Sequence, residues 1–161
     1  MEKEFVRLLN QHPGILYKIC QVYCQEEEDR KDLFQEMVLQ LWKAFPAFRN
    51  DSNASTWMYR VALNTAISNY RKGMRRPRSS PITLSLLQIP ELPERGQEEM
   101  SHLYAAIEML SPVEKALVTL YLDEKSYEEI AIILGISKSN VGVKLNRIKT
   151  KLEKMVKSIT Y

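Results

Sequence analysis

The stretch of sequence that decides the fold is SYEEIAIILGISKSNVGVKLNRIKTKL, residues Ser126–Leu152. Ser126 and Glu129 have the S-x-x-E spacing of a capping box, in which each side chain satisfies a free backbone amide at the start of a helix. Gly135 follows the apolar residues of that helix, at the position where a left-handed residue commonly ends a helix. Ser137 is then placed to cap a second helix. The pattern predicts two helices joined by a tight turn.

The second of these helices has one apolar face and one positively charged face. The apolar residues repeat at i, i+4, i+7 and i+11 and are Val141, Leu145, Ile148 and Leu152. The opposite face carries Lys138, Ser139, Asn140, Lys144, Asn146, Arg147, Lys149 and Lys151. A helix-turn-helix presents the N-terminal half of such a helix to the DNA major groove, and its charge attracts phosphate whatever the sequence bound. An ordinary helical hairpin with solvated lysines is the alternative that stays open.

Composition limits the classes of protein to consider. The chain has 161 residues, enough for one domain or two small ones, and a formal net charge of +3. Long helical periodicities with almost no alternating runs predict an all-α protein. No apolar stretch approaches the roughly 18 to 20 residues that span a bilayer, and no signal peptide opens the chain. We therefore expect a cytoplasmic protein without membrane insertion.

The sequence predicts no metal site and no cofactor. Cys20 and Cys24 lie four apart on a predicted helix, and His12 and His102 are the only histidines. This spacing lacks the CxxC pattern of zinc sites, so two small buried residues are expected, with redox sensing as the alternative. The acidic run 26–29 opens a helix, where it complements the helix dipole. Its carboxylates are consecutive and point in different directions, which does not suit a two-metal site.

Turn-forming residues divide the chain into two helical domains. Helical periodicity predicts helices at about 2–10, 14–25, 30–45, 55–72, 98–110 and 113–122, ahead of the helical pair at 126–152. Between them, Ser79-Ser80-Pro81, Pro90, Pro93 and Gly96 break any regular element. We therefore predict domains at 1–72 and 98–161, joined by a linker at 73–97.

Two stretches of the sequence resemble one family, the extracytoplasmic-function (ECF) sigma factors of bacterial RNA polymerase. Residues 32–66, DLFQEMVLQLWKAFPAFRNDSNASTWMYRVALNTA, look like region two of that family. Residues 110–152, LSPVEKALVTLYLDEKSYEEIAIILGISKSNVGVKLNRIKTKL, look like region four. The resemblance implies a promoter-specificity subunit without enzymatic activity. It would bind core RNA polymerase and promoter DNA, assist DNA melting, and have an anti-sigma factor as a further partner.

The resemblance also implies roles for individual residues. On the polar face of the 30–45 helix, the residues that would dock on the polymerase clamp helices are Asp32, Gln35 and Glu36. The residues that would form or flank a pocket for a flipped base of the minus-ten element are Ala44, Phe48, Trp57, Tyr59, Arg60 and Asn64. Those that would contact the minus-thirty-five element are Lys138, Ser139, Asn140, Val143, Lys144 and Arg147.

Without the resemblance, the same residues allow other interpretations, which stay open. Phe48 can fold back on Trp42 or Trp57 as core, and Asn64 can be a plain surface residue. Aromatics beside arginines and asparagines suit stacking on unpaired bases, but Trp57 suits a core equally well. The whole chain can also be a conventional helix-turn-helix regulator with an N-terminal helical sensor domain, or a pure protein-interaction module.

The recognition segment departs from the family pattern at two positions. The family usually has arginine and serine where this chain has Gly142 and Val143. Lys144 and Arg147 keep the positive charge, which favours phosphate binding. Asn140 can pair with adenine and Val143 can pack on a thymine methyl group, and the promoter sequence stays open.

Overall fold

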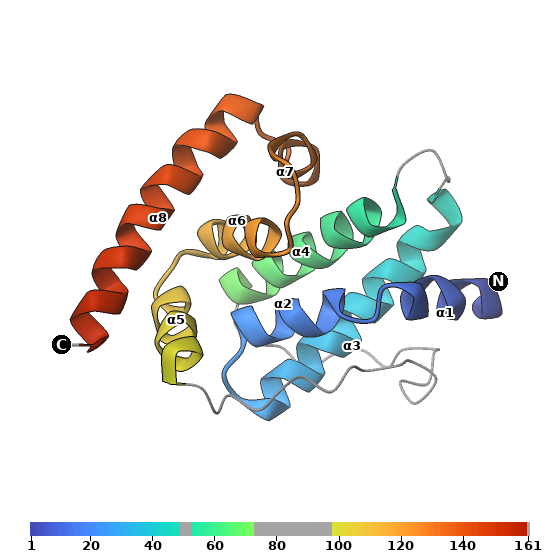
Figure 1. Ribbon diagram of the computed structural model, residues 1–161. Helices are drawn as coiled ribbons and strands as arrows, with labels where there is room; N and C mark the ends of the chain where they lie inside the picture. The colour runs from blue at the N-terminus through green and yellow to red at the C-terminus, as the bar shows by residue number, and fades with distance from the viewer. Residues whose placement is uncertain (49–52, 73–97, 161) are drawn as a thin grey trace. The chain divides into compact units, whose positions relative to one another are not determined.

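The computed structural model describes residues 1–48, 53–72 and 98–160, with the side chains of 98–101 and 159–160 left out. The chain divides into two compact units, unit 1 (Met1–Pro90) and unit 2 (Glu91–Tyr161). Every regular element in the described ranges is helical, which confirms the all-α prediction (Figure 1). The linker predicted at 73–97 lies outside these ranges. None of the helices described is both long and apolar enough to cross a membrane.

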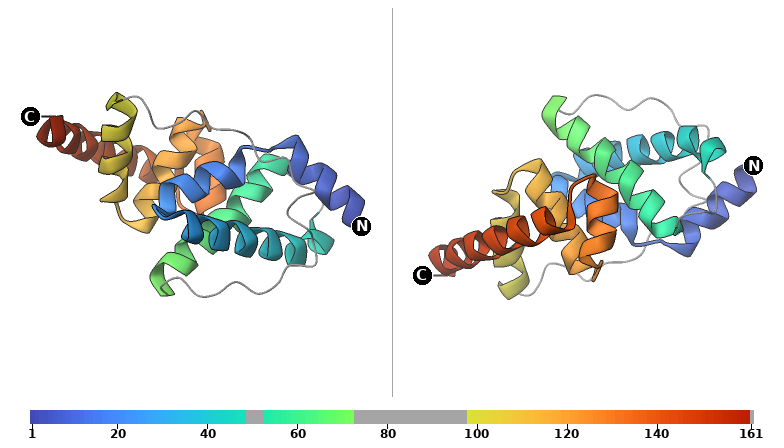
Figure 2. Two further views of the ribbon diagram at one scale, coloured as in Figure 1. Left: turned by 90° about the horizontal axis from the view of Figure 1, so that it is seen from below. Right: turned by 90° about the horizontal axis from the view of Figure 1, so that it is seen from above.

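Unit 1 is built on three helices that pack against one another. Its elements are α1 (Glu2–Gln11), α2 (Ile15–Tyr23), α3 (Glu27–Ala44), the 3-10 helix η1 (Phe45–Ala47) and α4 (Ala54–Lys72). Figure 2 shows α2, α3 and α4 side by side, and each of them contacts the other two. Leu33, Met37 and Leu41 form the fully buried stripe of α3. Burying each such side chain stabilises the fold by roughly 1.5–3 kcal/mol.

The first turn of α3 contains most of the acidic run, as predicted. The helix starts at Glu27, so that Glu27, Glu28 and Asp29 all lie in its first turn. Their carboxylates complement the positive end of the helix dipole, which extends the helix beyond its apolar periodicity.

Both cysteines are buried, as expected of core residues, and neither forms a disulfide. The thiol of Cys20 lies 3.5 Å from the backbone oxygen of Arg30. Burial raises the pKa of Cys20 far above its usual range; Cys24 adds to the rise and Arg30 opposes it. Burial thus disfavours the thiolate of Cys20, which makes it a poor nucleophile.

Unit 2 is organised around one long helix. Its elements are α5 (Glu98–Glu108), α6 (Pro112–Leu122), α7 (Tyr127–Leu134) and α8 (Lys138–Thr160). The other three helices pack on α8, which runs unbroken in both views of Figure 2. Val141, Leu145 and Ile148 are buried as predicted, and Leu152 is half-buried. In α7 the buried residues are Ile130 and Ile133.

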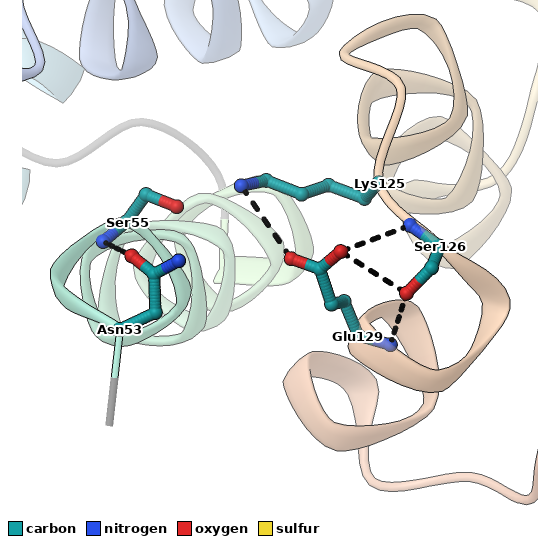
Figure 3. A network of polar contacts seen from close by, with 5 residues as sticks. All are labelled: Asn53, Ser55, Lys125, Ser126 and Glu129. Carbon is teal, nitrogen blue, oxygen red and sulfur yellow. Dashed lines mark hydrogen bonds and ion pairs between the residues drawn. The ribbon is translucent and has the colours of Figure 1, made fainter. Parts of the chain in front are cut away.

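Local capping explains where the helices of unit 2 begin and end. Complete capping boxes start α6 and α7, formed by Ser111 with Glu114 and by Ser126 with Glu129. In the second box, Glu129 N–H donates to Ser126 Oγ at 3.1 Å and Ser126 N–H donates to Glu129 Oε1 at 3.2 Å (Figure 3). Gly135 ends α7 in the left-handed conformation, with φ 70° and ψ 33°. The predicted helix-turn-helix is thus present in the structure.

Candidate nucleic-acid interface

The N-terminal half of α8 exposes all six residues predicted to contact the minus-thirty-five element. They are Lys138, Ser139, Asn140, Val143, Lys144 and Arg147. The start of the helix is fixed by the predicted cap, because Asn140 N–H donates to Ser137 Oγ at 3.1 Å. Val143 leaves 47% of its surface exposed on this otherwise polar face. These side chains thus lie on one accessible surface. Their contact with DNA stays a prediction.

Three lysines of α8 are engaged within unit 2. Lys138 forms an ion pair with Glu128 of α7, although both side chains are exposed. The Lys149 ammonium lies 4.3 Å from the ring centroid of Tyr121, and this neighbour raises the pKa of Lys149. Lys151 Nζ lies 3.3 Å from Glu114 Oε1. These contacts connect α8 to α6 and α7, and they engage three of its positively charged side chains within the unit.

Lys144 and Arg147 are available for an external partner. Both side chains are exposed, and neither forms an ion pair or hydrogen bond with another described residue. They are three residues apart, so they lie on the same side of the helix, one turn apart. Two unpartnered cations at this spacing suit contacts with neighbouring phosphates.

Gly142 lies where the recognition helix passes α7. A Cβ atom at this position would lie 3.6 Å from Cε2 of Tyr127, which is ordinary van der Waals contact. A small side chain therefore fits, and the glycine is not required by close packing. Its helical conformation makes it a net cost to α8, since glycine destabilises a helix interior by roughly 1 kcal/mol.

Aromatic rings gather where α3 ends and α4 begins. Phe48 packs on Trp57 with ring centroids 4.5 Å apart and stacks on Phe45 at 6.4 Å. Phe45 also contacts Trp57, and Phe5 of α1 contacts Phe45 at 5.2 Å. The alternative in which Phe48 packs on Trp57 is therefore the one observed. Phe48 is nevertheless only half-buried, as is Ala44 at the end of α3.

The residues predicted on α4 divide between surface and core. Arg60 and Asn64 are exposed and Trp57 is half-buried, so all three remain candidates for contact with DNA. Tyr59 is different because its side chain is 0% exposed, so it would support a pocket from within the core, and this role stays a prediction. Tyr59 lies on the buried side of α4, together with Met58, Ala62, Leu63 and Ala66.

The N-terminus of α4 is held by a local hydrogen bond that was not predicted. Asn53 Oδ1 accepts from Ser55 N–H at 3.0 Å (Figure 3). Asn53 directly precedes Ala54, the first residue of α4, and asparagine is among the residues preferred at this N-cap position. Residues 49–52, which follow Phe48 in the sequence, lie outside the described ranges.

The predicted polymerase-docking residues lie together on α3. Asp32, Gln35 and Glu36 are all half-buried, on a different side of the helix from the buried Leu33, Met37 and Leu41. Glu36 Oε1 accepts a hydrogen bond from the side chain of Gln40 at 3.0 Å. The three residues thus form one polar surface, which agrees equally with a docking face and with a solvated face.

The residues that organise the positive face of α8 were not predicted. Glu128 and Tyr121 are on neighbouring helices and contact Lys138 and Lys149 only because α7 and α6 pack beside α8. The sequence signal available was the acidic first turn of α7, which lies just ahead of a lysine-rich helix. In the part of the chain described, no three His, Cys, Asp or Glu side chains gather as a metal site.

Comparisons with known proteins match both halves of the chain to one family. Residues 8–76 match the model for Sigma-70 region 2, and residues 101–152 match the model for Sigma-70, region 4. The ECF RNA polymerase sigma-E factor of Escherichia coli (strain K12) is 30% identical over 144 residues, covering 81% of this chain and 75% of that protein. The RNA polymerase sigma-H factor of Pseudomonas aeruginosa is 26% identical, covering 85% and 78%.

Solved structures share the fold. The sigma factor RpoE from Bartonella quintana, solved with the anti-sigma factor NepR, matches with a TM-score of 0.73 and 19% identity, over 96% of this chain and 98% of that one. CnrH, solved with the cytosolic domain of CnrY, matches with a TM-score of 0.70 and 21% identity, over 98% and 90%. The two region models, in the predicted order, and the sigma-E relatives agree with the capped helix-turn-helix of unit 2. The chain belongs to the ECF sigma factors of the sigma-70 family.

Proposed function

We propose that this chain binds core RNA polymerase in the cytoplasm, directs it to promoters, and helps to melt them. The observation that carries the proposal is the N-terminal half of α8, where two exposed cations, Lys144 and Arg147, have no partner among the described residues. In a sigma-70 region 4 domain, such a face is placed to contact duplex DNA upstream of the start site. In this chain, that face of α8 would contact the minus-thirty-five element.

Unit 1 would serve the polymerase and the minus-ten element. Asp32, Gln35 and Glu36 form a polar surface on α3 that offers carboxylates and an amide to a basic partner. Arg60 and Asn64 extend from the exposed side of α4, and neither side chain has a partner among the described residues. An amide at this place can hydrogen-bond the edge of an unpaired base. Capture of that base would offset the few kcal/mol that unstacking typically costs.

An anti-sigma factor is the further partner that we infer. RpoE of Bartonella quintana was solved in complex with the anti-sigma factor NepR, and CnrH was solved in complex with the cytosolic domain of CnrY. The similarity of fold supports a protein of this class as the inhibitor of the present chain, without indicating its sequence. Exposed apolar side chains on unit 2, including Leu122 and Ile132, supply a surface for such a partner.

The experiment that tests the proposal is retention by core RNA polymerase, followed by transcription from a genomic DNA library. The chain should be retained by core and should start transcripts at a selected set of sites. The double variant Asp32→Lys/Glu36→Lys should lose retention, because it reverses the charge of the docking face. Glu2→Lys, on the exposed first turn of α1, is the matched control and should be retained like the wild type. Absence of wild-type retention would refute the proposal.

A further inference from the structure

A pocket on unit 1 lies between α2 and α3. Its volume is about 360 Å³, and cavities of roughly 300–1,000 Å³ are the size that holds small-molecule ligands. Helix α2 contributes Tyr17 and Cys20, one turn apart. Helix α3 contributes a stripe at i, i+3, i+4 and i+7, formed by Glu27, Arg30, Lys31 and Phe34. None of the residues predicted to contact polymerase or DNA is among the described residues that line this pocket.

The floor of the pocket is apolar. The rings of Tyr17 and Phe34 are half-buried, and Cys20 is only 3% exposed. The Cys20 thiol already donates to the backbone oxygen of Arg30 at 3.5 Å, so it presents a neutral sulfur to the pocket. Two aromatic rings and a buried thiol favour a ligand with an apolar body, because its burial removes apolar surface from water.

The rim of the pocket carries a cation without a matching anion. Arg30 is half-buried, and its Nε donates to the backbone oxygen of Cys24 at 3.1 Å. The guanidinium forms no ion pair with a described residue, so its terminal nitrogens keep their donors available. Lys31 lies beside it, with Nζ 3.8 Å from Glu27 Oε1, and both of these side chains are exposed. A surface pair of this kind is weak and leaves Lys31 able to turn toward another anion.

This combination fits a carboxylate that is attached to a flat apolar body. The terminal nitrogens of Arg30 can bind both carboxylate oxygens, which is the strongest arrangement for this pair of groups. The Tyr17 hydroxyl has no partner among the described residues and can donate to the same carboxylate. A neutral apolar molecule would bury the guanidinium further without an anion, which costs free energy, and a cationic molecule would be repelled by it.

We propose that this pocket binds a small aromatic carboxylate, with its carboxylate on Arg30 and its ring against Phe34. Such a ligand would contact α2 and α3 at once and stabilise their packing. Asp32, Gln35 and Glu36 lie outside the stripe of α3 that lines the pocket, so the ligand leaves the predicted docking face accessible. The proposal goes beyond the proposed function and needs neither polymerase nor DNA.

Nuclear magnetic resonance of the full chain, labelled with nitrogen-15, tests this site. The two probes are 2-naphthoate and 2-naphthamide, which have nearly the same shape and differ in charge. Titration with 2-naphthoate should shift the amide signals of Tyr17, Cys20 and Phe34 to saturation. The signals of Lys144 and Arg147 should not follow, since they report general attraction of anions to exposed cations. 2-Naphthamide should bind roughly tenfold more weakly or less, because it lacks the charge. Equal affinity for both probes, or no saturable shift at the pocket with 2-naphthoate, would overturn the proposal.

Variants of the rim give a second readout. Arg30→Met keeps an unbranched apolar stem but removes the guanidinium, so its affinity for 2-naphthoate should fall roughly tenfold or more, with little change for 2-naphthamide. Lys18→Met is the control, because Lys18 is an exposed cation of α2 that does not line the pocket, and it should bind 2-naphthoate like the wild type.

The native spectrum of Arg30→Met is checked first, since the variant also loses the hydrogen bond to Cys24. If it does not fold, Arg30→Lys takes its place. This variant keeps the charge but not the paired donors, and it should bind 2-naphthoate roughly threefold more weakly or less. Unchanged affinity for 2-naphthoate in the folded Arg30 variant would overturn the proposal.

Discussion

Lys138, the first residue of the recognition helix, forms an ion pair with Glu128 of the preceding helix. The hydrogen bond from Lys138 is the main reason why the pKa of Glu128 lies below its usual range. The pair ties α7 to α8 at the edge of the DNA-facing surface. It also means that one of the predicted phosphate-binding cations already has an anionic partner.

Removal of that partner should strengthen DNA binding. In Glu128→Gln, Lys138 is released and a negative charge near the DNA is lost, so duplex affinity should rise. The log-log salt slope should steepen by up to about 0.9, the value for one added phosphate contact. Fluorescence anisotropy over a salt series measures both quantities. Glu153→Gln, which removes an exposed acid farther along α8, is the control. Identical slopes for wild type and Glu128→Gln would show that Lys138 does not reach phosphate.

Loss of the two free cations should have the opposite effect. Lys144→Ala and Arg147→Ala should each weaken duplex binding and reduce the salt slope by about one unit per lost phosphate contact. Lys154→Ala is the matched control, since Lys154 is an exposed cation of α8 that also lacks a described partner but lies beyond the N-terminal half. An effect of Lys154→Ala as large as the other two would point to general electrostatic attraction instead of a docked helix.

Replacing two glycines of unit 2 with alanine should change its stability in opposite directions. Gly142→Ala should stabilise the unit by roughly 0.5–1 kcal/mol, because the new Cβ fits beside Tyr127 and alanine favours the helix. Gly135→Ala should destabilise it by about 1–2 kcal/mol, because a φ of 70° is strained for alanine even where space is open. Thermal unfolding by circular dichroism measures the difference. Tryptophan fluorescence should not change, since Trp42 and Trp57 both belong to unit 1. Stabilisation by both variants would contradict the role of Gly135 as a left-handed helix end.

The capping box of α6 should make the stability of unit 2 depend on pH. Burial raises the pKa of Glu114, but hydrogen bonds from Ser111 and Lys151 and the charge of Lys151 lower it more, so the net shift is downward. A carboxyl with a lowered folded pKa stabilises the fold above its unfolded pKa of about 4.3, and this stability is lost as pH falls through the folded pKa.

Glu114→Gln therefore should be less stable than the wild type near pH 7, and the difference should shrink toward pH 3. Denaturant unfolding followed by circular dichroism gives the difference at each pH. The control is Glu108→Gln, which changes a glutamate at the end of α5 that belongs to no capping box. If the difference in unfolding free energy between the two proteins stays constant with pH, the carboxylate charge of Glu114 does not contribute to stability.

Local signals explain what the sequence could predict. Ser126, Glu129 and Gly135 act within one helical turn of the helix ends, so their spacing alone predicted the helix-turn-helix that the structure contains. The pairing of Lys138 with Glu128 depends on how two helices pack, which spacing does not specify.

Aromatic residues were harder to place from the sequence. Tyr59 and Trp57 are two positions apart on one helix, yet one is fully buried and the other half-buried. Which of them faces the core depends on the packing of α4 against α2 and α3. For Phe48 the sequence left open a place in a base pocket and packing on Trp42 or Trp57. Its contact with Trp57 arises because the end of α3 meets the beginning of α4.

Promoter melting is the central claim, and Asn64 tests it most directly. Asn64 is exposed on α4 and has no partner among the described residues, so a purely structural role would leave Asn64→Ala without effect. If Asn64 instead holds an unpaired base, Asn64→Ala keeps core retention and closed-complex formation but depresses open complexes. The loss of one or two hydrogen bonds should cost about 1–3 kcal/mol, roughly five- to a hundredfold. Asn69→Ala, a half-buried asparagine of the same helix, is the control.

The decisive measurement is permanganate reactivity of thymines in the minus-ten region, compared at equal promoter occupancy. We predict strong reactivity with the wild type and with Asn69→Ala, and a clear loss with Asn64→Ala. Equal reactivity with all three proteins would contradict the claim, because Asn64 would then take no part in holding the melted strand.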